Sequence, residues 1–201
     1  MENTRFLYKY FQINGHKSIS ELLYYSLFFL ERTAKFKRYF VEADMKLTDV
    51  LRKEFIIPSL QGTTKEECIR LMIDVLAEHK VITNRERIYE AVIAREEIMT
   101  TGVGNGIAIP HCKDNSTRDF AVALGITENS IDFDAIDENP VHIIFLLVGP
   151  ESQPGMHIKL LSRISRLMGK EDIRDQLLKM KSAAEIHSLL AEEEDKFFDM
   201  E

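Results

Sequence analysis

The run VHIIFLLVG, Val141–Gly149, restricts the fold more than any other segment, because it is apolar at nearly every position. A strand that is solvated on one face alternates apolar and polar side chains, whereas a uniformly apolar strand is covered on both faces. Two further apolar runs precede it, GIAIPHC at 106–112 and FAVALGIT at 120–127. We therefore expect Val141–Gly149 to be a central strand of a sheet.

Segments with helical periodicity lie on either side of these strands. Thr64 with Glu67 forms a capping box for one helix, and Asn84 is an N-cap for the next. The expected helices cover 46–55, 63–79, 84–99, 156–168, 170–180 and 182–194, with a short strand at 55–60. Helices interleaved with buried strands predict an α/β domain, with a mixed central sheet flanked by helices on both faces. We expect the acidic end, 192–201, to be a solvated tail.

The first 44 residues differ in composition from the rest, being richer in basic and aromatic side chains. We therefore divide the chain into a helical, aromatic-rich extension, 1–44, and a domain, 45–201. The apolar stretch at 22–30 is shorter than the roughly 20 residues that span a bilayer. A helix packed on the domain or on a second copy is favoured over membrane contact, and Met45 as the natural start is a further alternative. We expect the extension to be dispensable for chemistry and to build a homo-oligomer.

Bulk properties exclude several classes of protein. With 201 residues and a formal net charge of -7, the chain lacks the clustered cations on which nucleic-acid binding depends. Two cysteines and the lack of a secretory signal indicate a reduced, cytoplasmic protein. No Cys-x-x-Cys or His-Glu-x-x-His spacing indicates a metal site, and GVGNG lacks the Lys-Ser/Thr ending of a nucleotide-binding P-loop. We predict neither metal nor cofactor.

His111 is the strongest candidate for chemistry. A neutral imidazole is a good nucleophile near pH 7. Glycines at 102, 104 and 106 precede it, where backbone N–H groups could approach a phosphoryl group, with a simple turn as the alternative. His157 lies at a strand–loop–helix junction, where α/β proteins tend to build sites.

The segment AREEIMTTGVGNGIAIPHCK resembles the active-site segment of enzyme IIA domains of the fructose–mannitol class. These domains belong to the bacterial phosphoenolpyruvate:sugar phosphotransferase system, and the class includes a nitrogen-regulatory paralogue. The resemblance covers about 46–195. It includes the Arg95-Glu96 pair, the run from Thr101 to His111, and IDFDAIDENPVHIIFLLVGP followed by the second histidine, His157.

The resemblance implies a phosphotransferase that acts through a phosphohistidine intermediate. His111 would accept the phosphoryl group from the phosphocarrier HPr or its nitrogen-branch equivalent. His157 would hydrogen-bond the imidazole or the phosphoryl oxygens, and Arg95 would supply a cationic donor. The donors expected along the preceding run are Thr101, Gly104, Asn105 and Gly106. The structural alternatives are an Arg95 paired with Glu96 or Glu90 and a His157 that only caps its helix.

Two positions depart from the family. Cys112 replaces the usual glycine after Pro-His, which introduces a thiol with potential redox chemistry. The sequence Asp-Glu-Asn replaces a usual Asp-Gly turn, and we expect Asn139 to adopt the left-handed conformation there.

Two roles use the same histidine. We favour a stand-alone regulatory enzyme IIA of the nitrogen type, which acts on regulatory target proteins. The alternative is a sugar-specific enzyme IIA that passes phosphate to a separate enzyme IIB. A degenerate binding module without phosphotransfer is disfavoured, because Arg95, His111 and His157 are all present.

Overall fold

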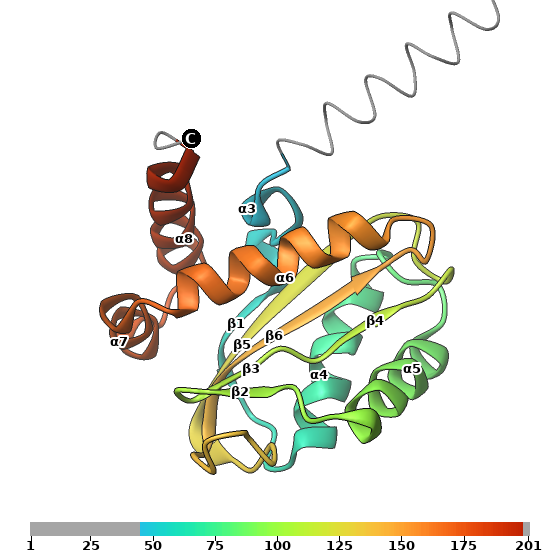
Figure 1. Cartoon of the computed structure of the whole chain (residues 1–201), viewed down its shortest axis with the longest axis horizontal. Coiled ribbons are helices and arrows are strands. Elements are labelled where there is room, and N and C mark those ends of the chain that lie inside the picture. Colours follow the sequence, from blue (N-terminus) through green and yellow to red (C-terminus); the bar gives the residue numbers. More distant parts are fainter. Residues whose placement is uncertain (1–44, 199–201) are drawn as a thin grey trace, which may run out of the picture. The chain divides into compact units, whose positions relative to one another are not determined.

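Strand β6, Val141–Gly149, lies inside a mixed sheet, as its apolar sequence predicts (Figure 1). The structure, a computed structural model, describes residues 45–198. Every residue of β6 is buried except His142, which is half-buried. Removal of this apolar surface from water on both faces of the strand strongly favours folding.

The sheet has the order β1-β5-β6-β3-β2, and β4 also pairs with β6. β5 is antiparallel to β6 and β2 to β3, whereas the remaining pairs are parallel. The prediction of a mixed sheet is therefore confirmed. The other strands are β1 (Ile56–Leu60), β2 (Gly102–Gly104), β3 (Ile107–Ala108), β4 (His111–Lys113) and β5 (Ala121–Ile131).

Helices cover both faces of this sheet. A Cβ at Gly125 of β5 would come within 3.3 Å of Met72 Sδ on α4, whereas the next residue, Ile126, lines a pocket with Leu178 of α7. Since successive strand residues point to opposite faces, α4 and α7 lie on opposite sides of the sheet. The helices are α3 (Leu47–Val50), α4 (Lys65–Glu78), α5 (Arg85–Ile98), α6 (Pro154–Met168), α7 (Glu171–Lys179) and α8 (Ala183–Phe198), with a 3₁₀ turn at Lys53–Phe55.

Both predicted N-caps are confirmed. The Thr64 side chain accepts a hydrogen bond from the N–H of Glu67, and the Asn84 side chain accepts one from the N–H of Arg87. The return bond of the capping box differs, because the Glu67 carboxylate accepts from the backbone and hydroxyl of Thr63.

The strand predicted at 106–112 is interrupted before His111. β3 ends at Ala108, and β4 begins at His111. Pro110 has no N–H for the ladder, but its carbonyl accepts from Leu147 N at 3.0 Å and keeps the chain beside β6. His111 then pairs with Leu147 at the start of β4.

The glycine-rich segment before His111 forms a two-residue hairpin turn. Asn105, with φ 55°, and Gly106, with φ 75°, lie between the paired residues Gly104 and Ile107. Asn-Gly suits such a turn because both positions need positive φ. The Asp137 carboxylate holds the turn by accepting from Asn105 N at 2.8 Å. Gly104 and Gly106 thus belong to a hairpin turn, whereas Gly102 lies in β2.

The left-handed conformation expected at Asn139 occurs instead at Glu138, with φ 59°, so that prediction is wrong. Asn139 donates both its backbone N–H and its side-chain amide to Asp137, at 3.2 Å and 2.9 Å. These bonds explain how a turn with Asn in place of Gly is held.

The acidic C-terminal segment is helical through Phe198, so the predicted solvated tail is wrong for its described part. Glu194 is only 2% exposed and accepts hydrogen bonds from the N–H groups of Leu47 and Thr48, at 2.5 Å and 3.1 Å. Arg163 of α6 donates to the same carboxylate at 3.1 Å. A carboxylate at the start of α3 satisfies N–H groups that the helix itself leaves without partners.

Replacing Glu194→Ala is expected to lower the free energy of unfolding by about 3 kcal/mol, because it removes a buried carboxylate that accepts from the N–H groups of Leu47 and Thr48 and from Arg163. Urea unfolding of the full chain measures the change. Glu192→Ala removes the same charge from an exposed position of α8 and is the control. Equal losses in the two variants would contradict this role of Glu194.

The extension assigned to 1–44 lies outside the described residues, so its helix, the domain boundary and its role in association stay predictions. Over residues 45–198, each helix is too short or too polar to cross a bilayer.

Candidate functional site

His111 is held by a backbone hydrogen bond at the beginning of β4. Its Nδ1 lies 2.8 Å from the carbonyl oxygen of Ile109. A carbonyl oxygen can only accept, so Nδ1 of the neutral ring carries the proton and Nε2 carries the lone pair. The ring is therefore fixed in the tautomer that leaves Nε2 as the nucleophilic atom.

The surroundings of His111 favour its neutral form. Burial is the largest cause of its lowered pKa, and the positive charges of Arg95 and Lys113 act in the same direction. The bond to Ile109 and the carboxylate of Glu96 oppose them without reversing the direction. With a pKa below the usual 6.5, the ring is uncharged at neutral pH.

His157 lies next to His111, on the first turn of α6. The two imidazole centroids are 5.4 Å apart, and the ring planes are tilted by 56°. The ring of Phe120 also contacts His157, with the centroids 6.2 Å apart. His157 is 4% exposed, and burial is the main cause that lowers its pKa to about 4. Within residues 45–198, neither of its ring nitrogens has a hydrogen-bond partner. Buried polar atoms without partners are rare and costly, which makes this ring a candidate for binding a group at the site.

Arg95, in the last turn of α5, lies close enough for its charge to lower the pKa of His111. Its Nη1 donates to the carbonyl of Met99 at 2.9 Å. Neither of the ion pairs considered for it, with Glu96 or with Glu90, is found among the described residues. The guanidinium fork has further N–H donors, which suit the oxygens of a phosphoryl group.

Thr101 was expected to donate to a phosphoryl group, but its donors are occupied. Its N–H and Oγ1 donate to the two carboxylate oxygens of Glu96, at 3.0 Å and 2.5 Å. Both side chains are buried. The prediction that Thr101 donates to a phosphoryl group is therefore not supported. Sequence reasoning assigned no role in the site to Glu96, the residue that holds Thr101. Its adjacency to Arg95 in the motif was the available signal.

The turn at Gly104–Gly106 is not brought to His111. β3 and β4 run along β6, with Ile107 opposite Ile143 and His111 opposite Leu147. Four residues of strand correspond to about 13 Å. In addition, the N–H of Asn105 is bound by Asp137. The phosphate contacts expected of Gly104, Asn105 and Gly106 are therefore not supported.

The thiol of Cys112 is buried on the face of β4 opposite to the His111 side chain. Burial raises its pKa to about 12, so the reactive thiolate is strongly disfavoured. The suggested redox chemistry of Cys112 has no support in this environment.

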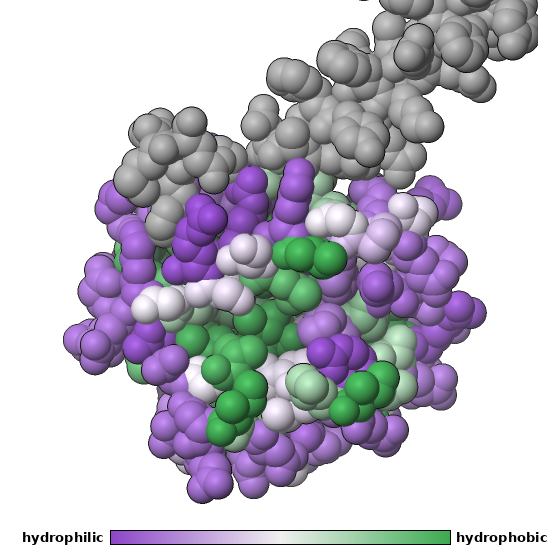
Figure 2. All heavy atoms as spheres, in the orientation of Figure 1, coloured by the Kyte–Doolittle hydropathy of each residue, from purple (hydrophilic) through white to green (hydrophobic). Residues whose placement is uncertain are grey.

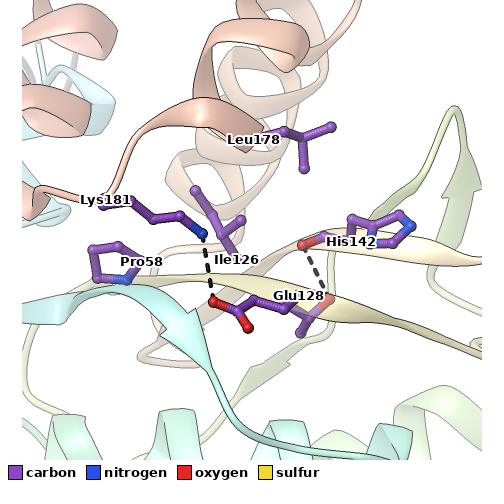
Figure 3. Close-up of a pocket in the computed structure, with 7 residues that line it drawn as sticks. Pro58, Ile126, Glu128, His142, Leu178 and Lys181 are labelled. Carbon is purple, nitrogen blue, oxygen red and sulfur yellow. Dashed lines mark hydrogen bonds and ion pairs between the residues drawn. The ribbon is translucent and has the colours of Figure 1, made fainter.

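A cavity of about 340 Å³ lies elsewhere, between α7 and the sheet (Figure 3). Lys181 and Glu128 form an ion pair at 3.5 Å at its rim, and the hydroxyl of Thr127 donates to the carbonyl of His142 at 3.4 Å. His142 lies five residues before Leu147, the strand partner of His111. The cavity is thus separate from the two-histidine site.

Comparison with known proteins gives a consistent family assignment. The family model described as "Phosphoenolpyruvate-dependent sugar phosphotransferase system, EIIA 2" matches residues 49–193. A nitrogen regulatory protein of Bradyrhizobium diazoefficiens is 34% identical over 73% of this chain and 95% of its own length. A fructose-specific EIIABC component of Bacillus subtilis is 36% identical over 69% of this chain, which spans only 22% of that protein.

A solved structure has the same fold. The nitrogen regulatory protein IIA-Ntr of Neisseria meningitidis superimposes with a TM-score of 0.68 at 28% identity, over 72% of this chain and 98% of that one.

Proposed function

This chain belongs to the EIIA 2 family of the phosphoenolpyruvate-dependent sugar phosphotransferase system, and we propose that it carries its phosphoryl group on His111. The chain is a phosphoryl carrier, as the family and its nitrogen-regulatory and fructose-specific relatives establish. The observation that carries the assignment to His111 is its fixed tautomer, with Nε2 free, beside the unpartnered ring of His157.

In the proposed step, the lone pair of His111 Nε2 attacks the phosphorus of a phosphorylated carrier protein. The new bond joins Nε2 to phosphorus while the bond between phosphorus and the carrier's phosphorylated atom breaks, and that electron pair returns to the carrier. No proton has to leave Nε2, because Nδ1 already holds it. The ring is fixed before the reaction, so little reorganisation is needed.

Two neighbours stabilise the transferred group in this proposal. His157 is neutral, since its pKa is about 4, and can donate one ring N–H to a phosphoryl oxygen. Arg95 supplies positive charge from the end of α5. The test is whether His111→Ala still takes up a phosphoryl group from the phosphorylated carrier.

An apolar surface around the site is proposed to receive the partner protein. Figure 2 shows apolar side chains gathered on one face of the domain. Ile158 follows His157 on α6 and is 68% exposed, and Met99 follows the helix that carries Arg95 and is 63% exposed. Ile136 lies against β2, where its N–H donates to the Gly102 carbonyl at 3.0 Å. Exposed apolar side chains around a reactive centre are typical of a protein-docking surface.

Ile158→Ser is expected to raise the KM for the phosphorylated carrier about tenfold and to leave kcat nearly unchanged, because it removes docking area without touching the reacting atoms. Initial rates at varied carrier concentration measure both constants. Leu71→Ser, an exposed leucine on α4, is the matched control. An unchanged KM in Ile158→Ser would place docking elsewhere.

Of the two roles for this carrier, we propose the regulatory, nitrogen-type one, with the sugar-specific role as the alternative. The likeness to the Neisseria IIA-Ntr structure, with a TM-score of 0.68 at 28% identity, supports it. A comparison of kcat/KM with purified phosphocarriers of the nitrogen and sugar branches tests this choice. A clear preference for the sugar-branch carrier would favour the alternative.

A further inference from the structure

Glu96 is a buried carboxylate that the phosphoryl transfer described above does not use directly. It is 7% exposed and binds both donors of Thr101, the N–H at 3.0 Å and the hydroxyl at 2.5 Å. Lys65 of α4 approaches it to 3.9 Å and also pairs with Asp134 at 3.0 Å. Burial of a carboxylate is costly, and two hydrogen bonds from one residue indicate that Thr101 is what it holds.

Two more hydrogen bonds connect Thr101 to the imidazole of His111. The carbonyl of Thr101 accepts from the N–H of Ile109 at 2.9 Å. The carbonyl of Ile109 then accepts from Nδ1 of His111 at 2.8 Å. Three hydrogen bonds in series therefore connect the Glu96 carboxylate to the His111 ring, through the backbones of Thr101 and Ile109.

We propose that Glu96 is a positioning residue for phosphoryl transfer, which fixes the orientation and tautomer of His111 through the backbone of Thr101 and Ile109. The inference rests on the proposed role of His111 as the phosphoryl acceptor. Glu96 does not contact the reacting atoms in this proposal.

The position of the Ile109 carbonyl decides which nitrogen of His111 carries the proton. Ile109 belongs to the interruption between β3 and β4, so β-ladder pairing does not fix it from both sides. The bond to Thr101 supplies the missing restraint, and Glu96 restrains Thr101 in turn.

Glu96→Gln tests the proposal, because it keeps the shape but removes the charge and one of the two acceptor oxygens. We expect kcat for phosphoryl uptake to fall about tenfold with KM for the carrier unchanged, since misplacing a reacting group by a fraction of an ångström has effects of this size. Glu97→Gln removes the same charge from the next, exposed position of α5 and should keep the normal kcat.

A second readout separates positioning from a general structural role. Ring ¹⁵N chemical shifts of His111 in the full chain should show one tautomer, protonated at Nδ1, in the unaltered protein and in Glu97→Gln. Glu96→Gln should show a mixture of tautomers. Thr101→Val, which removes only the hydroxyl donor, should shift the mixture in the same direction, and Thr101→Ser should restore the single tautomer.

Two results would overturn the proposal. One is a normal kcat and a single Nδ1-protonated tautomer in Glu96→Gln, provided that His111→Ala is inactive. The other, should Glu96→Gln lose its fold, is a normal kcat and tautomer in Thr101→Val. Phosphate that persists on His111→Ala would instead refute the role of His111 itself, so the two failures are distinguishable.

Discussion

His111→Ala is expected to abolish the acid-labile phosphate that the full chain gains from phosphoenolpyruvate, enzyme I and a phosphocarrier. The loss should exceed a thousandfold, because the variant lacks the nucleophile rather than a group that assists it. The backbone bond to Nδ1 of His111 leaves the lone pair on Nε2, which makes this ring the candidate nucleophile. The neighbouring ring of His157 is nearly fully buried and is less accessible to a partner protein. A phosphorus–nitrogen bond on imidazole hydrolyses in acid, so acid treatment distinguishes the product from a phosphate on serine or threonine.

The control for this experiment is His187→Ala, which removes a partly exposed histidine of α8 and should keep full labelling. Far-ultraviolet circular dichroism of both variants checks that each is folded. Label that persists on folded His111→Ala would show that another residue is the nucleophile.

Sequence reasoning succeeded where a local property decides the structure. The uniform apolar character of Val141–Gly149 required cover on both faces, and β6 is buried inside the sheet. Asn84 could be assigned as an N-cap because the cap depends on one side chain and the next turn of backbone. The proximity of His111 and His157 came from the family resemblance, since no local rule relates β4 to α6.

The predictions that the structure does not support depended on tertiary contacts. The glycines at 104 and 106 suit both a phosphate loop and a hairpin, and only the register along β6 places Ile107, the residue after the turn, about 13 Å from His111. Thr101 looked available as a donor until Glu96 was found to occupy it. Glu194 looked solvated because its partners, Leu47 and Thr48, lie more than 140 residues away in the sequence.

His157→Ala is expected to lower the rate of phosphoryl uptake by His111 about a hundredfold without abolishing it. The ring is neutral and buried beside His111, and its nitrogens lack partners within the described residues. Removal of one preorganised donor from a site that stabilises developing charge has an effect of this size. His157→Gln, which keeps a side-chain N–H donor, should recover part of the rate, and His142→Ala, on β6 and outside the site, should leave it unchanged.

The pH dependence of the same variant provides the sharper test. Burial is the largest cause of the lowered pKa of His111, and the groups that also act on it are the carbonyl of Ile109, Arg95, Glu96 and Lys113. The nucleophile must be neutral, so the uptake rate falls as the pH drops through the His111 pKa, which lies below 6.5 in the intact site. Replacing His157 by alanine admits water to the ring, which moves this pKa back towards 6.5 and makes the rate fall at a higher pH. An intact rate and an unshifted pH profile in His157→Ala would show that His157 neither binds the phosphoryl group nor shields His111 from water.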